Sequence, residues 1–115
     1  MHEFSIMTYL LEGVEAEARQ RQARKVTAIN LILGERAGID DSLLFYFDEL
    51  TPGTIAEGAK LNIRRTKMSF VCAACDAEYS PDPKRGDFAC PRCGEVGQLT
   101  NDASDLLIES IEIAT

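Results

Sequence analysis

Several kinds of residue are scarce in this sequence of 115 residues. It contains one histidine, four cysteines, and 12 Lys and Arg against 19 Asp and Glu, which gives a formal net charge of −7. Binding to nucleic acid or to an anionic membrane depends on clustered Lys and Arg, so the charge balance argues against both kinds of partner. No apolar run approaches the roughly 20 residues that span a bilayer. The length is that of one compact domain, which disfavours repeat arrays and multidomain enzymes.

The first residues also lack the features of a secretory signal. Such a signal has a basic start, an apolar core and a small-residue cleavage site, whereas this chain begins MHEFS. We therefore expect a cytoplasmic protein. Thiols stay reduced in the cytoplasm, so paired cysteines there indicate metal ligands or a redox group before structural disulfides.

The hydrophobic pattern predicts an α+β fold with two helices and a small mixed sheet. Ser5 is a candidate cap for a first helix, whose apolar residues recur at the three-to-four spacing of one face; they are Ile6, Met7, Leu10, Leu11, Val14 and Ala18. The apolar run 26–33 ends at Gly34 and predicts a buried strand. A second helix, capped by Asp40 or Asp41, is indicated by a further apolar stripe made of Leu43, Leu44, Phe47 and Leu50. We expect the apolar members of its Phe45-Tyr46-Phe47 segment to pack in the core.

The pattern changes in the second half of the chain. Residues 61–63 and 69–71 have strand-like composition, and 106–113 reads as a final strand returning to the first part. Between them, residues 72–93 are small and polar and cannot bury enough apolar surface to fold by themselves. We therefore predict a first domain made of residues 1–66 plus 102–115, with an inserted zinc-ribbon-like domain at 67–101.

The four cysteines form two CxxC pairs with 14 residues between them. Two thiolates three positions apart can reach one metal from a tight turn, and two such turns supply the four soft ligands that tetrahedral zinc accepts. We predict a zinc site made of Cys72, Cys75, Cys90 and Cys93. A closed shell of four thiolates leaves no position for a reacting water, so its role is structural, and the metal replaces a hydrophobic core in this insertion.

Other functions of the cysteine pairs remain open at this stage. A thioredoxin-like redox site needs one CxxC pair, and the chain has two. A zinc ribbon can also bind nucleic acid, but the insertion has no basic face and only three aromatic residues. No nucleophile and base, phosphate loop or paired acid and base is evident in the sequence, so we do not expect an enzyme.

The single histidine, His2, directly follows the first methionine. The free amine of Met1, the amide nitrogen of His2 and its imidazole can close fused chelate rings around one ion. The amide of Glu3 can add another nitrogen, or its carboxylate can offset positive charge near the start of the first helix. Nitrogen donors arranged in a plane suit Ni(II) or Cu(II) better than zinc. Most such termini are unused, so this signal alone is weak.

The combination of features resembles the HypA/HybF family of nickel-hydrogenase maturation factors. The features are the start Met1-His2-Glu3, Gly34-Glu35 at the end of the first strand, the two late CxxC pairs, and the closing sequence 107–112, LIESIE. The resemblance implies a nickel metallochaperone with an inserted zinc domain. It implies delivery of nickel to the [NiFe]-hydrogenase large subunit together with the GTPase HypB, and in some organisms to urease maturation.

The resemblance also assigns residues to the two metals. Nickel falls on His2 with the Met1 amine and the Glu3 position, and zinc on the four cysteines. Some relatives recruit a further nickel ligand after the first strand, and Asp40 occupies that position here, although capping the second helix is its ordinary alternative. Extra imidazole ligation, as proposed in some relatives, has no second histidine available to it.

Overall fold

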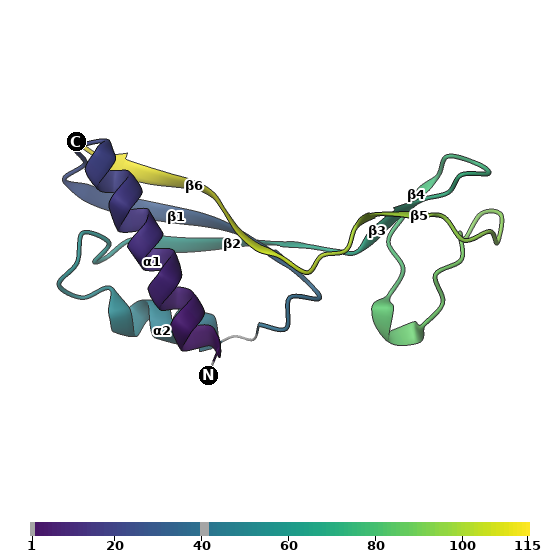
Figure 1. The fold of residues 1–115 in the computed structure, drawn as a ribbon, viewed down its shortest axis with the longest axis horizontal. Coiled ribbons are helices and arrows are strands. Elements are labelled where there is room, and N and C mark those ends of the chain that lie inside the picture. Colours follow the sequence, from purple (N-terminus) through teal and green to yellow (C-terminus); the bar gives the residue numbers. More distant parts are fainter. Residues whose placement is uncertain (1, 40–41) are drawn as a thin grey trace. The chain divides into compact units, whose positions relative to one another are not determined.

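The computed structural model of the chain describes residues 2–39 and 42–115. They form two compact units (Figure 1). The first unit consists of Met1–Ile32, Ile39–Arg64 and Leu107–Thr115, and the second of Leu33–Gly38 and Arg65–Leu106. The predicted insertion at 67–101 falls within the second unit, which also takes in the segment 33–38.

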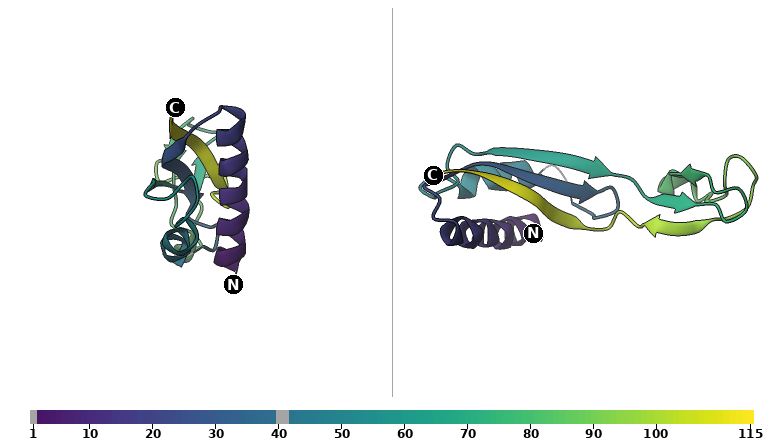
Figure 2. Two further views of the ribbon diagram at one scale, coloured as in Figure 1. Left: turned by 90° about the vertical axis from the view of Figure 1, so that its left-hand side faces the viewer. Right: turned by 90° about the horizontal axis from the view of Figure 1, so that it is seen from above.

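Two helices and a three-stranded sheet make up the first unit. Helix α1 (His2–Gln20) leads into β1 (Lys25–Gly34), α2 (Ser42–Leu50) lies between β1 and β2 (Lys60–Thr66), and β6 (Leu106–Ala114) returns from the second unit. The strand order is β2–β1–β6, and the strands β1 and β2 run in one direction while β6 runs in the other (Figures 1 and 2). The sheet is therefore mixed, which confirms the predicted α+β fold with two helices.

The core of the first unit lies between the sheet and the helices. The central strand β1 is the most buried strand, with alternation of buried and less buried residues along its length. Helix α1 contributes the face predicted from its spacing. The buried residues of these two elements are Met7, Leu10, Leu11, Val14, Ala18, Val26, Ala28, Ile29, Leu31 and Leu33.

The start of α1 differs from the prediction. Ser5 does not cap the helix, because α1 already begins at His2 and Ser5 is an exposed residue inside its first turns. The ring of Phe4 meets that of Tyr46 from α2 edge to face, with 5.5 Å between the ring centroids. This contact packs the first turn of α1 against α2 and explains why the helix extends beyond the candidate cap.

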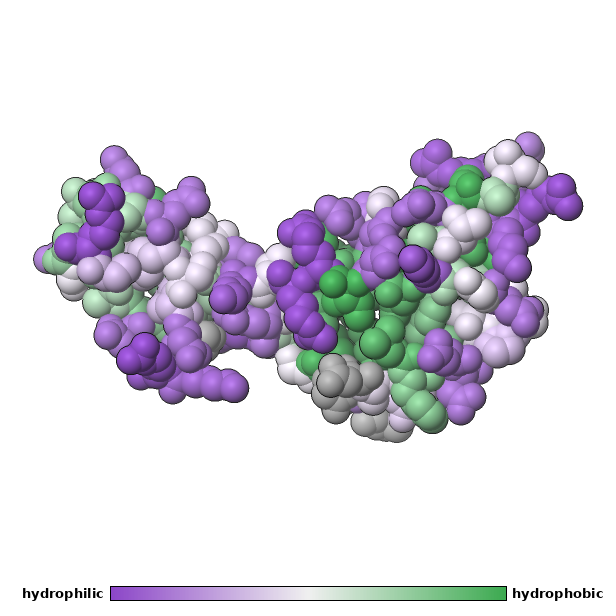
Figure 3. All heavy atoms as spheres, turned by 180° about the vertical axis from the view of Figure 1, so that it is seen from behind, coloured by the Kyte–Doolittle hydropathy of each residue, from purple (hydrophilic) through white to green (hydrophobic). Residues whose placement is uncertain are grey.

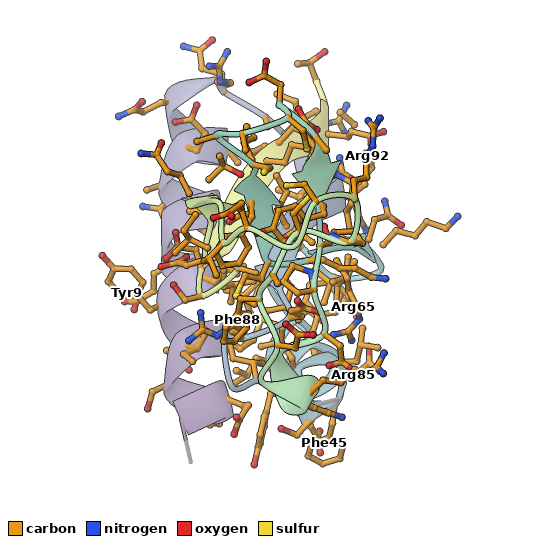
Figure 4. The ribbon with its side chains drawn as sticks, turned by 90° about the vertical axis from the view of Figure 1, so that its right-hand side faces the viewer. Tyr9, Phe45, Arg65, Arg85, Phe88 and Arg92 are labelled. Atoms are coloured by element: carbon orange, nitrogen blue, oxygen red, sulfur yellow. The ribbon has the colours of Figure 1, made fainter. Side chains whose placement is uncertain are left out.

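The apolar stripe of α2 is narrower than predicted. Leu43 and Phe47 are buried, but Leu44 is 46% exposed and Phe45 is 58% exposed. The prediction that Phe45 packs in the core was therefore wrong; its side chain projects from the helix, as does that of Tyr9 from α1 (Figure 4). The helix ends at Leu50 as predicted. The candidate caps Asp40 and Asp41 lie outside the described residues.

The second unit contains a small antiparallel sheet with the strand order β4–β3–β5. Strand β3 (Ser69–Val71) pairs with β4 (Glu78–Tyr79) on one side and with β5 (Gln98–Asn101) on the other. A short 3₁₀ helix, η1 (Pro83–Arg85), lies between β4 and β5. The two CxxC pairs therefore follow β3 and precede β5, at the same end of this sheet.

The segment that follows β1 is hydrogen-bonded into the second unit. The amide of Gly34 donates to the carbonyl of Asp105 at 2.9 Å, and the amide of Arg36 donates to that of Ala103 at 2.7 Å. Gly34 is required by this close approach, because a Cβ added to it would lie 2.2 Å from the carbonyl oxygen of Ala103. The Glu35 carboxylate also accepts the amide of Met68 at 2.8 Å.

The surfaces of the two units differ in character. Seen from behind, hydrophobic residues gather on the first unit, while the second is mostly hydrophilic or neutral (Figure 3). Across the described residues, neither helix combines the length and the apolar character needed to cross a membrane.

Candidate metal centres

The structure brings the four cysteines of the second unit together. Their Sγ atoms all lie within 4.8 Å of one another. The Sγ atoms of Cys72 and Cys93 are 3.3 Å apart, and those of Cys75 and Cys90 are 3.7 Å apart. A disulfide has sulfur atoms about 2.05 Å apart, so these are free thiols. Four thiolates bound at about 2.3 Å to a tetrahedral zinc lie about 3.8 Å from one another, and the observed cluster matches that spacing.

Both CxxC pairs sit in the same kind of tight turn. In each turn the amide of the first cysteine donates to the carbonyl five residues later: Cys72 to Ala77 at 2.9 Å, and Cys90 to Glu95 at 2.7 Å. The amide of Arg92 points inward and lies 3.4 Å from the Cys90 sulfur. Amides aimed at sulfur stabilise the thiolate form that a metal needs. The repeated CxxC pattern thus folds into two equivalent turns.

Each turn closes on a residue with positive φ. Gly94 has φ of 82°, as expected for the glycine after the second pair, and Asp76 has φ of 60° at the equivalent place after the first. Each of these two residues donates its amide at 2.8 Å to the carbonyl of the first cysteine in its turn. The positive φ of Asp76 was not predicted from the sequence. Its only signal is that Asp tolerates the left-handed conformation better than most non-glycine residues.

An aromatic cluster supports the cysteines. The ring of Phe70 stacks on Tyr79 with centroids 5.4 Å apart and on Phe88 with centroids 5.9 Å apart. The Tyr79 hydroxyl donates to the carbonyl of Phe88 at 2.7 Å and accepts the amide of Gly97 at 2.9 Å. Cys72 and Cys90 are buried in the same cluster. Because Phe70 and Tyr79 are each only 9% exposed, their faces are committed to the core and do not form a platform for stacked bases.

Hydrogen bonds, burial and neighbouring sulfurs shift the pKa values of Cys90 and Cys93 in opposite directions. Burial opposes ionisation of Cys90, but hydrogen bonds from the amides of Arg92 and Cys93 outweigh it and lower the pKa of Cys90 to about 7. The amide of Glu95 favours the thiolate of Cys93, yet the neighbouring sulfur of Cys72 and the other thiols raise the pKa of Cys93 to about 12. The raised pKa of Cys93 means that a cation among the sulfurs favours its thiolate form at neutral pH. The donor set and spacing of the four cysteines fit zinc.

The predicted nickel residues are placed only in part. Glu3 lies in the first turn of α1, partly buried. Met1, Asp40 and the side chain of His2 lie outside what the structure describes. The backbone of His2 is described and opens the helix. In an α-helix the first four N–H groups have no acceptor within the helix. The amides of His2 and Glu3 are among these four, and groups outside the helical ladder accept their hydrogen bonds.

Comparison with known proteins gives a consistent result over the whole chain. The sequence model of the family described as "Hydrogenase/urease nickel incorporation, metallochaperone, hypA" matches residues 1–113. A hydrogenase maturation factor HypA of Caldanaerobacter subterraneus subsp. tengcongensis is 37% identical over 115 residues, covering 98% of this chain and 99% of the relative. One from a Roseiflexus strain is 40% identical over 114 residues, covering 97% and 91%.

Two solved structures have the same fold. A solution structure of HypA protein superposes with a TM-score of 0.68 at 25% identity and covers 98% of this chain and 96% of its own. The solution structure of the Ni metallochaperone HypA from Helicobacter pylori gives a TM-score of 0.66 at 22% identity, covering 97% of both chains.

Proposed function

The chain belongs to the HypA family of nickel-incorporation metallochaperones, and from this premise we propose that it carries Ni(II) on donors at its amino terminus. It is a maturation factor and not an enzyme. The nickel is its cargo, delivered during maturation of [NiFe]-hydrogenase. The four-cysteine cluster of the second unit holds a different metal, zinc, which stays in place.

One observation carries the nickel proposal: helix α1 begins at His2. The amide of His2 then lies in the first turn, where no helical carbonyl accepts it. An amide that gives up its proton to bind nickel loses no helical hydrogen bond there, and the positive end of the helix dipole favours the negative charge that results. With the terminal amine of Met1 and the imidazole of His2, this amide nitrogen makes the planar donor set that suits Ni(II).

Carboxylates near this set are secondary ligands in the proposal. Glu3 offers an oxygen as well as its amide nitrogen, and its negative charge is favourable in the first turn of a helix. Asp40 remains a candidate ligand through its place after β1. The chain has no second histidine to supply another imidazole, so the affinity depends on the terminal nitrogens.

The two metals have different fates because their donors differ. Four thiolates, held in two hydrogen-bonded turns and packed on an aromatic cluster, form a closed cage that keeps its zinc. Donors at a chain terminus can capture an ion and release it to a partner. We assign the zinc a structural role: it stabilises the second unit, whose aromatic cluster is small.

The partners follow from the role of a carrier in hydrogenase maturation. We propose that the protein works in the cytoplasm with the GTPase HypB and the large subunit of [NiFe]-hydrogenase, and that urease maturation proteins are further candidates. The description of the family joins hydrogenase and urease in nickel incorporation.

The test is a nickel titration of the zinc-loaded protein. Wild type is expected to bind one nickel, with affinity falling on mild acidification, because an amine of pKa about 8 and an imidazole of about 6.5 must lose their protons to coordinate. His2→Ala, and a variant with one residue placed before Met1, are expected to lose stoichiometric binding. Ser5→Ala is the matched control: it lies in the same exposed part of α1 and supplies no proposed ligand.

Native mass spectrometry of the same variants separates the two metals. Each variant is expected to retain one zinc, since the change lies outside the second unit. An unchanged nickel titration in His2→Ala or in the extended variant contradicts the proposed nickel site. Loss of zinc in either variant contradicts the separation of the two sites.

A further inference from the structure

A groove runs between helix α1 and strand β6 in the first unit. Its volume is about 540 Å³. It is lined on the helix side by Gly13, Val14, Glu17 and Arg21, and on the strand side by Ile108, Glu109, Ser110, Ile111 and Ile113. The strand side includes consecutive residues, which point to opposite faces of a sheet. The groove therefore follows the edge of the strand and not one of its faces.

Strand β6 is the edge of the sheet on that side. In the order β2–β1–β6 it pairs with β1 (Figure 2), and the strands of the described chain include no partner for its outer edge. An edge strand presents a row of outward N–H and C=O groups that can pair with another extended segment. Leu107 and Ile108, near its start, are 53% and 43% exposed.

The helix side of the groove contains a glycine that the chain's own fold does not require. Gly13 lies in the interior of α1, where glycine lowers helix stability relative to alanine. A Cβ added there would have no atom within 4 Å. Close packing within the chain therefore does not account for the missing side chain. Because Gly13 lines the groove, its missing side chain leaves the groove open.

The charges along the groove select the kind of occupant. Strand β6 carries Glu109 and Glu112 and has no Lys or Arg. Glu17 on the helix side pairs with Arg21 at 3.0 Å, and Glu109 pairs with Arg64 at 3.2 Å. The Glu112 carboxylate accepts the side-chain amide of Asn30, a neutral partner, at 3.2 Å, so its negative charge remains at this edge. A second copy of β6 would bring like charges opposite each other, which destabilises a strand pair.

We propose that the edge of β6 and the groove beside Gly13 bind an extended segment of a partner protein by strand addition, and that this segment alternates apolar and basic side chains. Its backbone pairs with β6. Its apolar side chains enter the groove against α1, and its basic side chains face the carboxylate of Glu112. This inference goes beyond nickel binding and does not depend on it.

The test uses a blocked heptapeptide of alternating lysine and valine as the probe. In amide spectra of ¹⁵N-labelled, zinc-loaded protein, saturable shifts are expected in β6 and in α1 around Gly13. A heptapeptide of the same composition with its valines grouped at one end is expected to bind at least tenfold more weakly, since it has the same charge without the alternation.

Two variants of matched bulk locate the site. Gly13→Leu fills the groove and is expected to weaken binding of the alternating peptide at least tenfold. Ala16→Leu adds leucine at a nearby exposed helix position, outside the groove lining and without a change of charge, and is expected to bind as wild type does. Melting curves of both variants verify that they are folded. Both variants are also expected to keep the wild-type nickel titration, so failure here is distinguishable from failure of the nickel proposal.

Three results would overturn the proposal. The first is equal binding of the two peptides, or the absence of binding, and the second is Gly13→Leu binding as tightly as wild type. The third is a β6 shift that grows with protein concentration in the absence of peptide, together with a dimer in sedimentation, because the occupant would then be a second copy of this chain.

Discussion

Replacing Gly34 by alanine tests the tight contact at the end of β1. The added Cβ would lie 2.2 Å from the carbonyl oxygen of Ala103 and 2.3 Å from its carbon. Contacts this short are not tolerated, so one of the two backbones must move. Neither moves freely, because the Ala103 carbonyl accepts the amide of Arg36 and the Gly34 amide donates to Asp105.

Two effects lower the free energy of unfolding in Gly34→Ala. Each weakened backbone hydrogen bond loses about 1 kcal/mol, and overpacking adds about 1–3 kcal/mol of strain. We expect the free energy of unfolding to fall by roughly 3 kcal/mol, which corresponds to a melting temperature lower by roughly 10 °C. Urea unfolding of the zinc-loaded protein, followed by far-ultraviolet circular dichroism, measures the difference.

The matched control for this prediction is Gly13→Ala. The same addition of one methyl group there meets no atom within 4 Å and replaces glycine in a helix interior. It is expected to raise the free energy of unfolding by about 0.5–1 kcal/mol. A Gly34→Ala variant that unfolds at the same urea concentration as wild type refutes the reasoning from the close approach.

Two further predictions concern the second unit. Tyr79→Phe leaves the carbonyl of Phe88 and the amide of Gly97 without their hydroxyl partner and is expected to cost about 1–3 kcal/mol in urea unfolding, whereas Tyr9→Phe, at an exposed ring, is expected to change nothing measurable. Zinc binding at neutral pH is expected to release protons, since the raised pKa of Cys93, about 12, keeps that thiol protonated until the metal takes the thiolate. The apparent zinc affinity therefore falls as the pH falls. Calorimetry in two buffers of different ionisation enthalpy counts the protons, and a binding heat independent of the buffer contradicts the prediction.

Periodic and repeated patterns predicted most of the fold. Apolar residues recur regularly along the face of α1, and they form a continuous run in β1. The structure has a helix and a buried strand at these predicted places. The two CxxC pairs also predicted their own clustering, because two equal turns with two thiolates each have few other ways to pack. Features that depend on local repetition are thus readable without a structure.

Features that depend on distant contacts were harder to predict. Ser5 has the side chain of a helix cap, but the contact between Phe4 and Tyr46 extends the helix past it, and that contact joins two elements separated by a strand. The exposure of Phe45 has a similar cause. The apolar stripe of α2 is wider than its buried face, so the sequence does not indicate which of the apolar residues face the core. Packing of α2 against α1 determines which of them are buried.

The return of β6 to the sheet has a consequence for folding during synthesis. The side-chain amide of Asn30 on β1 donates a hydrogen bond to the carboxylate of Glu112 on β6, 82 residues later. Pairings this distant in sequence form slowly, and this one cannot form until the ribosome has made residue 112. The pairings in the sheet of the second unit span at most 32 residues, from Ser69 to Asn101, and all of these residues are made before residue 112. The sheet of the first unit therefore closes with the last strand to be synthesised, after all four cysteines of the second unit have been made.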